Sequence, residues 1–140
     1  MDNISLIRSD VERLRLDGWE YVTSVPYDIL KASYNGTGPE FLSENIRKRL
    51  DSITKPFLPA IMVHDLDFTR SDGTIISFNK ANNRILKNCI KCAADTHPWY
   101  SWRRYALMVE AIVIYRACQK FGWIAWRSAY LKNKHKKETK

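Results

Sequence analysis

The sequence has little cysteine, glycine or proline, and it has no long apolar run. Its 140 residues include three cysteines, five glycines and five prolines. An odd, sparse set of cysteines excludes a disulfide framework and is typical of a reducing compartment. The longest apolar run, 105–115, contains Glu110 and is much shorter than the ~20 residues that a membrane span needs. The N-terminus also lacks the pattern of a signal peptide. We therefore expect a soluble protein made in a cytoplasm.

Negative charge is also scarce, with 15 Asp and Glu against 23 Lys and Arg, for a formal net charge of +8. This balance favours anionic partners such as phospholipid surfaces, nucleic acid or acidic proteins. Part of the excess lies in 132–140, which we predict to be a flexible basic tail. No recognisable nucleic-acid-binding module accompanies the charge, so nucleic acid is the least favoured partner.

Helix signals dominate the N-terminal third. The Ser9–Glu12 capping box predicts a short helix that Gly18 ends and that can start as early as Ile4. Residues 19–25 alternate aromatic and β-branched side chains over a short stretch, which favours an extended connector. Pro26 then opens a helical turn or two.

The remaining chain reads as helices separated by Gly and Pro. Helical spacing of apolar residues predicts helices over 40–53, 54–69 and 78–94. His97–Pro98 then breaks the pattern. The segment 99–131 is apolar around much of its circumference, so we expect it to be the central core helix, with a kink at Gly122. The sequence predicts a single all-α domain over 1–131 with about five or six helices.

A His-Asp pair directly follows an apolar run in the helix predicted over 54–69. Burying ionisable groups without partners costs several kcal/mol, so His64 and Asp65 need partners. Earlier in the chain, the glycine-rich loop Asn35–Pro39 can turn several carbonyl oxygens toward one point. With Asp65 these oxygens would suit Ca²⁺, and His64 could activate a water nearby. The alternative is an ordinary turn, a structural histidine and a solvated aspartate.

The motif order resembles a known family. Asn35-Gly36-Thr37-Gly38-Pro39, then His64-Asp65-Leu66-Asp67-Phe68, then Ala81-Asn82 resemble the phospholipase A2-like proteins of tailed bacteriophages. The order is also similar to that of the parvovirus-capsid type of phospholipase A2. The resemblance covers about 34–127 and leaves 1–33 as an N-terminal extension. It implies a core of a Gly-rich loop and two central helices, followed by a long C-terminal helix.

The same resemblance implies hydrolysis of phospholipid esters at a membrane surface, with calcium as cofactor. It further implies synthesis in a host cytoplasm, association with the virion, and virion components or host proteins as partners.

Residue roles follow from the resemblance by position. His64 would be the general base and Asp65 a calcium ligand, and Phe68 stands where the family has a supporting Tyr. The other calcium ligands would be the carbonyl oxygens of Asn35, Gly36, Thr37 and Gly38. Asn82 stands where parvovirus-type enzymes have Asp, so it can orient the imidazole but cannot neutralise an imidazolium; in triad enzymes the Asp-to-Asn change costs roughly 10⁴ in kcat. Asp67 or Asp95 could supply the missing carboxylate.

Three alternatives remain open at this point. The protein could keep the fold without the chemistry, as a virion, tail or host-interaction component. Cys89, Cys92, His97 and Cys118 could form a zinc site, although small buried cysteines explain the spacing better. The C-terminal segment also carries many basic and aromatic residues, which could bind a lipid interface or partly pack in the core. These residues are Trp99, Tyr100, Trp102, Arg103, Arg104, Trp123, Trp126, Arg127 and Tyr130.

Overall fold

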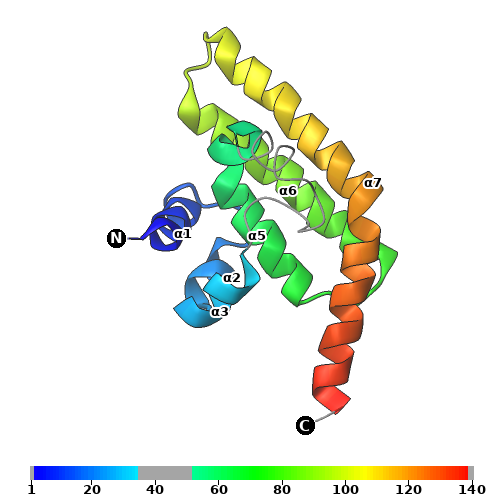
Figure 1. The fold of residues 1–140 in the computed structure, drawn as a ribbon. Coiled ribbons are helices and arrows are strands. Elements are labelled where there is room, and N and C mark those ends of the chain that lie inside the picture. Colours follow the sequence, from blue (N-terminus) through cyan, green and yellow to red (C-terminus); the bar gives the residue numbers. More distant parts are fainter. Residues whose placement is uncertain (1, 35–51, 139–140) are drawn as a thin grey trace.

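The described residues of the computed structural model, 2–34 and 52–138, are helical and contain no strand, which confirms the all-α prediction. Six α-helices are present in this part of the chain (Figure 1). They are α1 (Asn3–Arg13), α2 (Trp19–Ser24), α3 (Tyr27–Ser33), α5 (Leu58–Thr69), α6 (Ile75–Thr96) and α7 (Trp102–Glu138), with a 3₁₀ turn, η1 (Lys55–Phe57), before α5. The predicted loop at 35–39 and the predicted helix over 40–53, except for its last two residues, lie outside the described residues.

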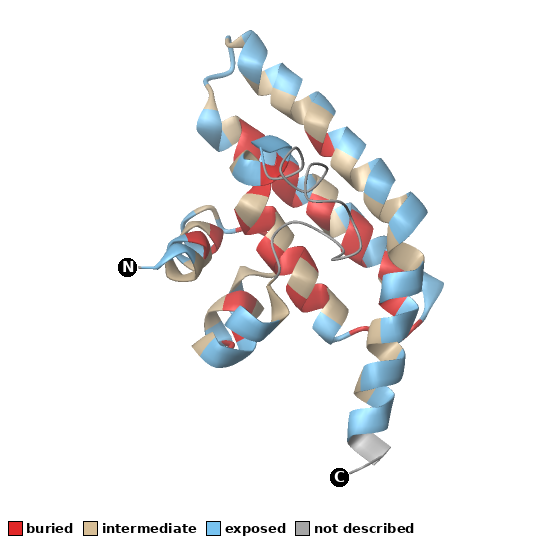
Figure 2. Ribbon diagram, in the orientation of Figure 1, coloured by how far each residue is buried: buried red, intermediate tan, exposed pale blue. Residues whose placement is uncertain are grey.

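The central helix is α5, which contacts α1, α2 and α3 as well as α6 and α7 (Figure 1). Seven of its twelve residues are buried, as expected for a helix with neighbours on several sides. The expectation that the C-terminal segment is the central helix is wrong. Among the α7 residues whose burial is described, 102–136, only Ala111 and Trp126 are buried, because α7 packs mainly on α6 and leaves the rest of its circumference exposed (Figure 2).

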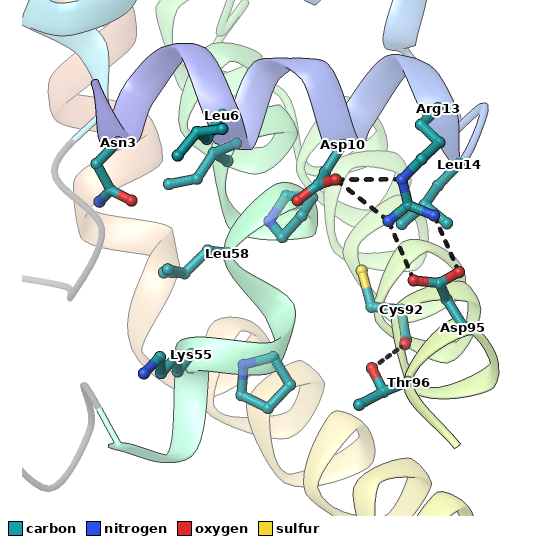
Figure 3. Close-up of a pocket in the computed structure, with 13 residues that line it drawn as sticks. Asn3, Leu6, Asp10, Arg13, Leu14, Lys55, Leu58, Cys92, Asp95 and Thr96 are labelled. Carbon is teal, nitrogen blue, oxygen red and sulfur yellow. Dashed lines mark hydrogen bonds and ion pairs between the residues drawn. The ribbon is translucent and has the colours of Figure 1, made fainter. Parts of the chain in front are cut away.

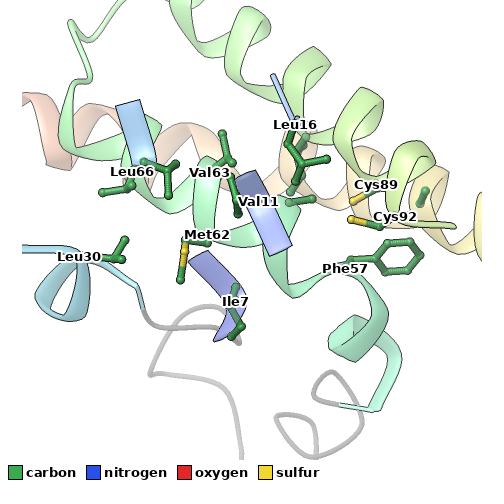
Figure 4. Close-up of a cluster of buried hydrophobic side chains, with 14 of the residues drawn as sticks. Ile7, Val11, Leu16, Leu30, Phe57, Met62, Val63, Leu66, Cys89 and Cys92 are labelled. Atoms are coloured by element: carbon green, nitrogen blue, oxygen red, sulfur yellow. The ribbon is translucent and has the colours of Figure 1, made fainter. Parts of the chain in front are cut away.

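The main core lies where α1 and the segments around α2 and α3 pack onto α5 and α6. Its side chains are aliphatic and aromatic with two cysteines (Figure 4). They include Ile7, Val11, Leu16, Leu30, Phe57, Met62, Val63, Leu66, Cys89 and Cys92. A second, smaller cluster joins α6 to α7 through Phe78, Ala81 and Trp126. Burial of this apolar surface is the main force that holds the helices together.

The N-terminal third differs from the prediction at both ends of the first helix and in the segment after it. The prediction that Gly18 ends the first helix is wrong, since α1 ends at Arg13 and Gly18 precedes α2. The first helix begins at Asn3, because the carboxylate of Asp2 accepts a hydrogen bond from the backbone N–H of Ser5 at 2.8 Å and caps it. The predicted capping box at Ser9–Glu12 is therefore wrong and lies inside α1. The predicted extended connector is also wrong, since 19–24 form α2, whose Val22 is fully buried. Tertiary burial overrides a weak β-pattern over so short a stretch.

The later helices agree with the sequence, apart from one division and one extension. Helix α6 covers the stretch predicted as 78–94 and ends just before His97–Pro98, whereas the stretch predicted as one helix over 54–69 is divided between η1 and α5. Helix α7 continues to Glu138, through most of the segment that we expected to be a flexible tail. The Nδ2 of Asn133 donates to the carbonyl oxygen of Thr69 at 2.9 Å, which ties this last part of α7 to the end of α5.

The corner between α5 and α6 is fixed to the second half of α7. The Ser71 hydroxyl donates to the Trp126 carbonyl at 2.8 Å, and Arg127 donates to the Gly73 carbonyl at 3.1 Å. Gly73 has φ +75° and a Cβ there would lie 2.6 Å from the Tyr130 ring. Glycine is therefore required at this turn both by backbone conformation and by space.

Candidate functional site

His64 of α5 and Asn82 of α6 form a buried pair. The imidazole Nε2 lies 3.3 Å from the Asn82 Oδ1, and the two side chains are 8% and 1% exposed. With the amide oxygen facing the ring, Nε2 carries the proton and donates it, which leaves the lone pair on Nδ1. The expected contact between the histidine and the asparagine is confirmed. It forms because α5 and α6 pack side by side.

Burial sets the protonation state of this histidine. Removal from water lowers the pKa of His64 from 6.5 to about 4, and the hydrogen bond with Asn82 opposes this only in part. The imidazole is therefore neutral at pH 7 and able to accept a proton. It is a weak base, because the neutral amide of Asn82 cannot stabilise the charged form as a carboxylate would.

Phe68 supports the imidazole by packing. It lies one turn after His64 on α5, with its ring centroid 5.0 Å from the imidazole in an edge-to-face arrangement. The ring of Trp126 of α7 also packs edge-to-face on Phe68, with the centroids 5.1 Å apart. The sequence indicated that Phe68 would lie near His64, but it did not indicate that Trp126 would pack against Phe68. The cluster of tryptophans in the C-terminal segment was the only signal available.

Asp67 is held by arginines. Its Oδ1 accepts from Arg84 of α6 at 2.8 Å and from Arg70 at 3.1 Å, and the side chain is 7% exposed. Burial raises the pKa of the Asp67 carboxyl, whereas the two arginines lower it. Arg84 also contacts Asp17, and the guanidinium of Arg70 stacks on Tyr21. The network fastens α2 and the loop before it to α5 and α6.

Neither proposed substitute for the missing carboxylate serves His64. Asp67 is paired as described, and Asp95 forms a two-point ion pair with Arg13 near the end of α6 (Figure 3). That ion pair borders a pocket of about 290 Å³ between α1, η1 and α6, which His64 does not line. A second pocket of about 270 Å³ is lined by Asp67, Arg84 and Trp126, among others, and again not by His64. The suggestion that Asp67 or Asp95 orients the imidazole is wrong.

The expected calcium ligands are only partly within the described residues. Asn35, Gly36, Thr37 and Gly38 lie outside them. Asp65 lies on α5 next to His64 and is half-buried. Among the described residues no group of three or more His, Cys, Asp and Glu side chains could hold a metal ion. Of the expected ligands, the structure therefore places Asp65 alone, on α5 beside His64.

The cysteines and His97 do not come together as a zinc site either, since all four lie in the described residues and form no such group. Cys89 and Cys92 are buried in the main core, and Cys118 is partly buried. Burial raises the pKa of Cys92 to about 11 and of Cys118 to about 12, so both thiols stay protonated at neutral pH.

Comparison with known proteins gives no match to a protein-family model, to a curated protein or to a solved structure. Within the described residues, no helix combines the length and apolar character needed to cross a bilayer. The buried His64–Asn82 pair and its surroundings are therefore the features of this chain that bear on its function.

Proposed function

We propose that this chain is a phospholipase A2-like protein that hydrolyses phospholipid esters at a membrane surface. The observation that supports the proposal is the buried hydrogen bond between His64 and Asn82. The motif order requires these two residues, 18 positions apart, to meet across two packed helices. A buried structural histidine has no need of that particular partner.

In the proposed reaction His64 is the general base. Its Nδ1 takes a proton from a water molecule while the water oxygen attacks the ester carbonyl carbon. The bond between that carbon and the alkoxide oxygen then breaks, the imidazolium returns the proton to the alkoxide, and the alcohol and the fatty acid are released. Asn82 holds the tautomer and the ring orientation through Nε2. Asp65 and the carbonyl oxygens of 35–38 are the proposed calcium ligands, and calcium, when bound, polarises the ester carbonyl. Because burial lowers the pKa of His64 to about 4, we expect slow turnover.

The test is calcium-dependent release of fatty acid from phospholipid vesicles. His64→Ala and Asp65→Ala should both abolish release. Asn82→Asp should increase release, because a carboxylate beside the imidazole raises the pKa of His64 and stabilises the imidazolium. Asn83→Asp is the matched control: Asn83 is exposed and its Oδ1 accepts from Tyr115, as a carboxylate also would. Release that is absent from every phospholipid, together with a Tm that calcium does not change, would refute the proposal.

A second candidate function keeps the fold without the turnover. It is favoured by the neutral partner of His64 and by the burial that makes this base weak. The protein would then be a phage virion, tail or host-interaction component. His64→Ala should change stability or assembly while no lipid is hydrolysed by either protein. Copurification with virion particles or a host protein supports this function, and robust hydrolysis by the isolated chain contradicts it.

A further inference from the structure

Helix α7 exposes large apolar side chains along its solvent side. Eight of them are 50 to 79% exposed. They are Trp102, Tyr105, Val109, Ile112, Val113, Phe121, Ile124 and Leu131. The first five recur at intervals of three and four residues and therefore share one side of the helix. We call these eight side chains the outer face of α7. Single exposed apolar residues are ordinary, whereas a row along one helix calls for a partner.

The same helix carries most of the net positive charge of the chain. The stretch 102–138 holds nine Lys and Arg residues and two Glu, whereas the whole chain has a net charge of +8. Two of these cations lie beside exposed rings of the outer face. The Arg103 guanidinium is 5.8 Å from the Trp102 ring, and the Lys120 ammonium is 5.5 Å from the Phe121 ring.

The loop just before α7 adds two more aromatic side chains beside this surface. Trp99 and Tyr100, just before the helix, are 72% and 73% exposed. The Tyr105 hydroxyl donates to the Trp99 carbonyl at 2.7 Å, which holds this loop against the start of α7. Tryptophan and tyrosine suit the headgroup level of a bilayer, where one end of the ring is apolar and the other is hydrated.

Charge and apolarity together select one kind of partner. We propose that the outer face of α7 binds the surface of an anionic lipid bilayer and lies in the plane of the interface. Phosphate groups match the cations, and the acyl boundary buries side chains such as Val109 and Ile124. Nucleic acid would match the cations but leave these aliphatic side chains in water. A second copy would place two strongly basic helices face to face, which like charges oppose.

This surface goes beyond the proposed hydrolysis, because binding does not require chemistry at His64. The two proposals therefore fail separately. His64→Ala should lose hydrolysis and still bind vesicles as the wild type does. Variants of the outer face should lose vesicle binding with an unchanged Tm, whatever the outcome of the hydrolysis assay.

The apolar contribution is tested by flotation with phosphatidylglycerol–phosphatidylcholine vesicles. The double variant Ile112→Ser/Ile124→Ser should weaken binding by roughly tenfold per side chain. The matched control is Ile29→Ser/Ile76→Ser, on α3 and α6, whose isoleucines are 53% and 68% exposed. The control should bind as the wild type does. Equal loss in both double variants, or in neither, overturns the proposal.

The charge contribution is tested with the same vesicles. Arg116→Gln/Lys120→Gln should weaken binding by about fivefold per cation, whereas Lys31→Gln/Lys87→Gln, which removes the same charge from α3 and α6, should have little effect. Pure phosphatidylcholine vesicles should bind far less well than the anionic ones. Equal binding to both lipids would refute the anionic specificity. If the chain instead binds an oligonucleotide more tightly than it binds these vesicles, and Ile112→Ser/Ile124→Ser does not weaken that binding, the partner is nucleic acid and the lipid assignment is overturned.

Discussion

Acid should destabilise the fold through His64. Burial lowers the pKa of its imidazole from 6.5 to about 4, so at pH 5 the unfolded chain binds a proton that the folded chain does not. Because the folded-state pKa is depressed, the stability is complete above the unfolded pKa and is lost as the pH falls from 6.5 toward 4. Between pH 7.5 and 5 the loss from this group alone is about 2 kcal/mol.

Urea denaturation of the wild type and His64→Gln at pH 7.5 and 5 measures this loss. Glutamine is polar, similar in size and does not titrate, so the wild type should lose about 2 kcal/mol more than the variant over this interval. His97→Gln, at the end of α6, is the matched histidine control and should retain the wild-type loss. Burial raises the pKa of Asp67, which acts in the opposite direction, but both proteins carry this residue and its effect cancels.

Two results would refute the reasoning. One is an equal loss of stability in the wild type and His64→Gln. The other is an NMR titration in which the imidazole of folded His64 protonates near pH 6.5. Either result would mean that the imidazole is hydrated in solution. The expectation of slow turnover, which depends on His64 being a weak base, would then be wrong as well.

Three further predictions concern the packing. Asn88→Ala should lower the free energy of unfolding by about 2 kcal/mol, because its buried amide bonds both the N–H and the carbonyl of Asp17; urea melts measure this. Gly73→Ala should lower the free energy of unfolding by at least about 1 kcal/mol, because alanine is strained at the positive φ of this position. Gly122→Ala, whose Cβ would lie no nearer than 3.4 Å to a neighbouring atom, should leave the free energy of unfolding unchanged or raise it by up to about 1 kcal/mol. A change of the same sign in both variants contradicts this. Cys92 should react with a thiol reagent at pH 8 only after denaturation, since burial raises its pKa to about 11. Rapid labelling of the native protein would show that it is accessible.

The sequence alone determined the helices that form the site. The spacing of apolar residues located α5 and α6, and His97–Pro98 located the end of α6. The resemblance in motif order also indicated that His64 and Asn82 would meet. These features are local or depend on two adjacent helices, and a helical period together with a proline is enough to specify them.

The tertiary structure decided which helix is central and what each charged group contacts. Helix α7 is more apolar in sequence than its position requires, and only its packing against α6 on one side shows that the rest of it faces solvent. Asp67 pairs with Arg84, 17 residues away, and Asp95 pairs with Arg13, 82 residues away. An ion pair depends on the distance between two side chains after folding. The apolar content of a helix indicates that part of its surface can be buried, but how much of that surface is buried depends on how many other helices pack around it.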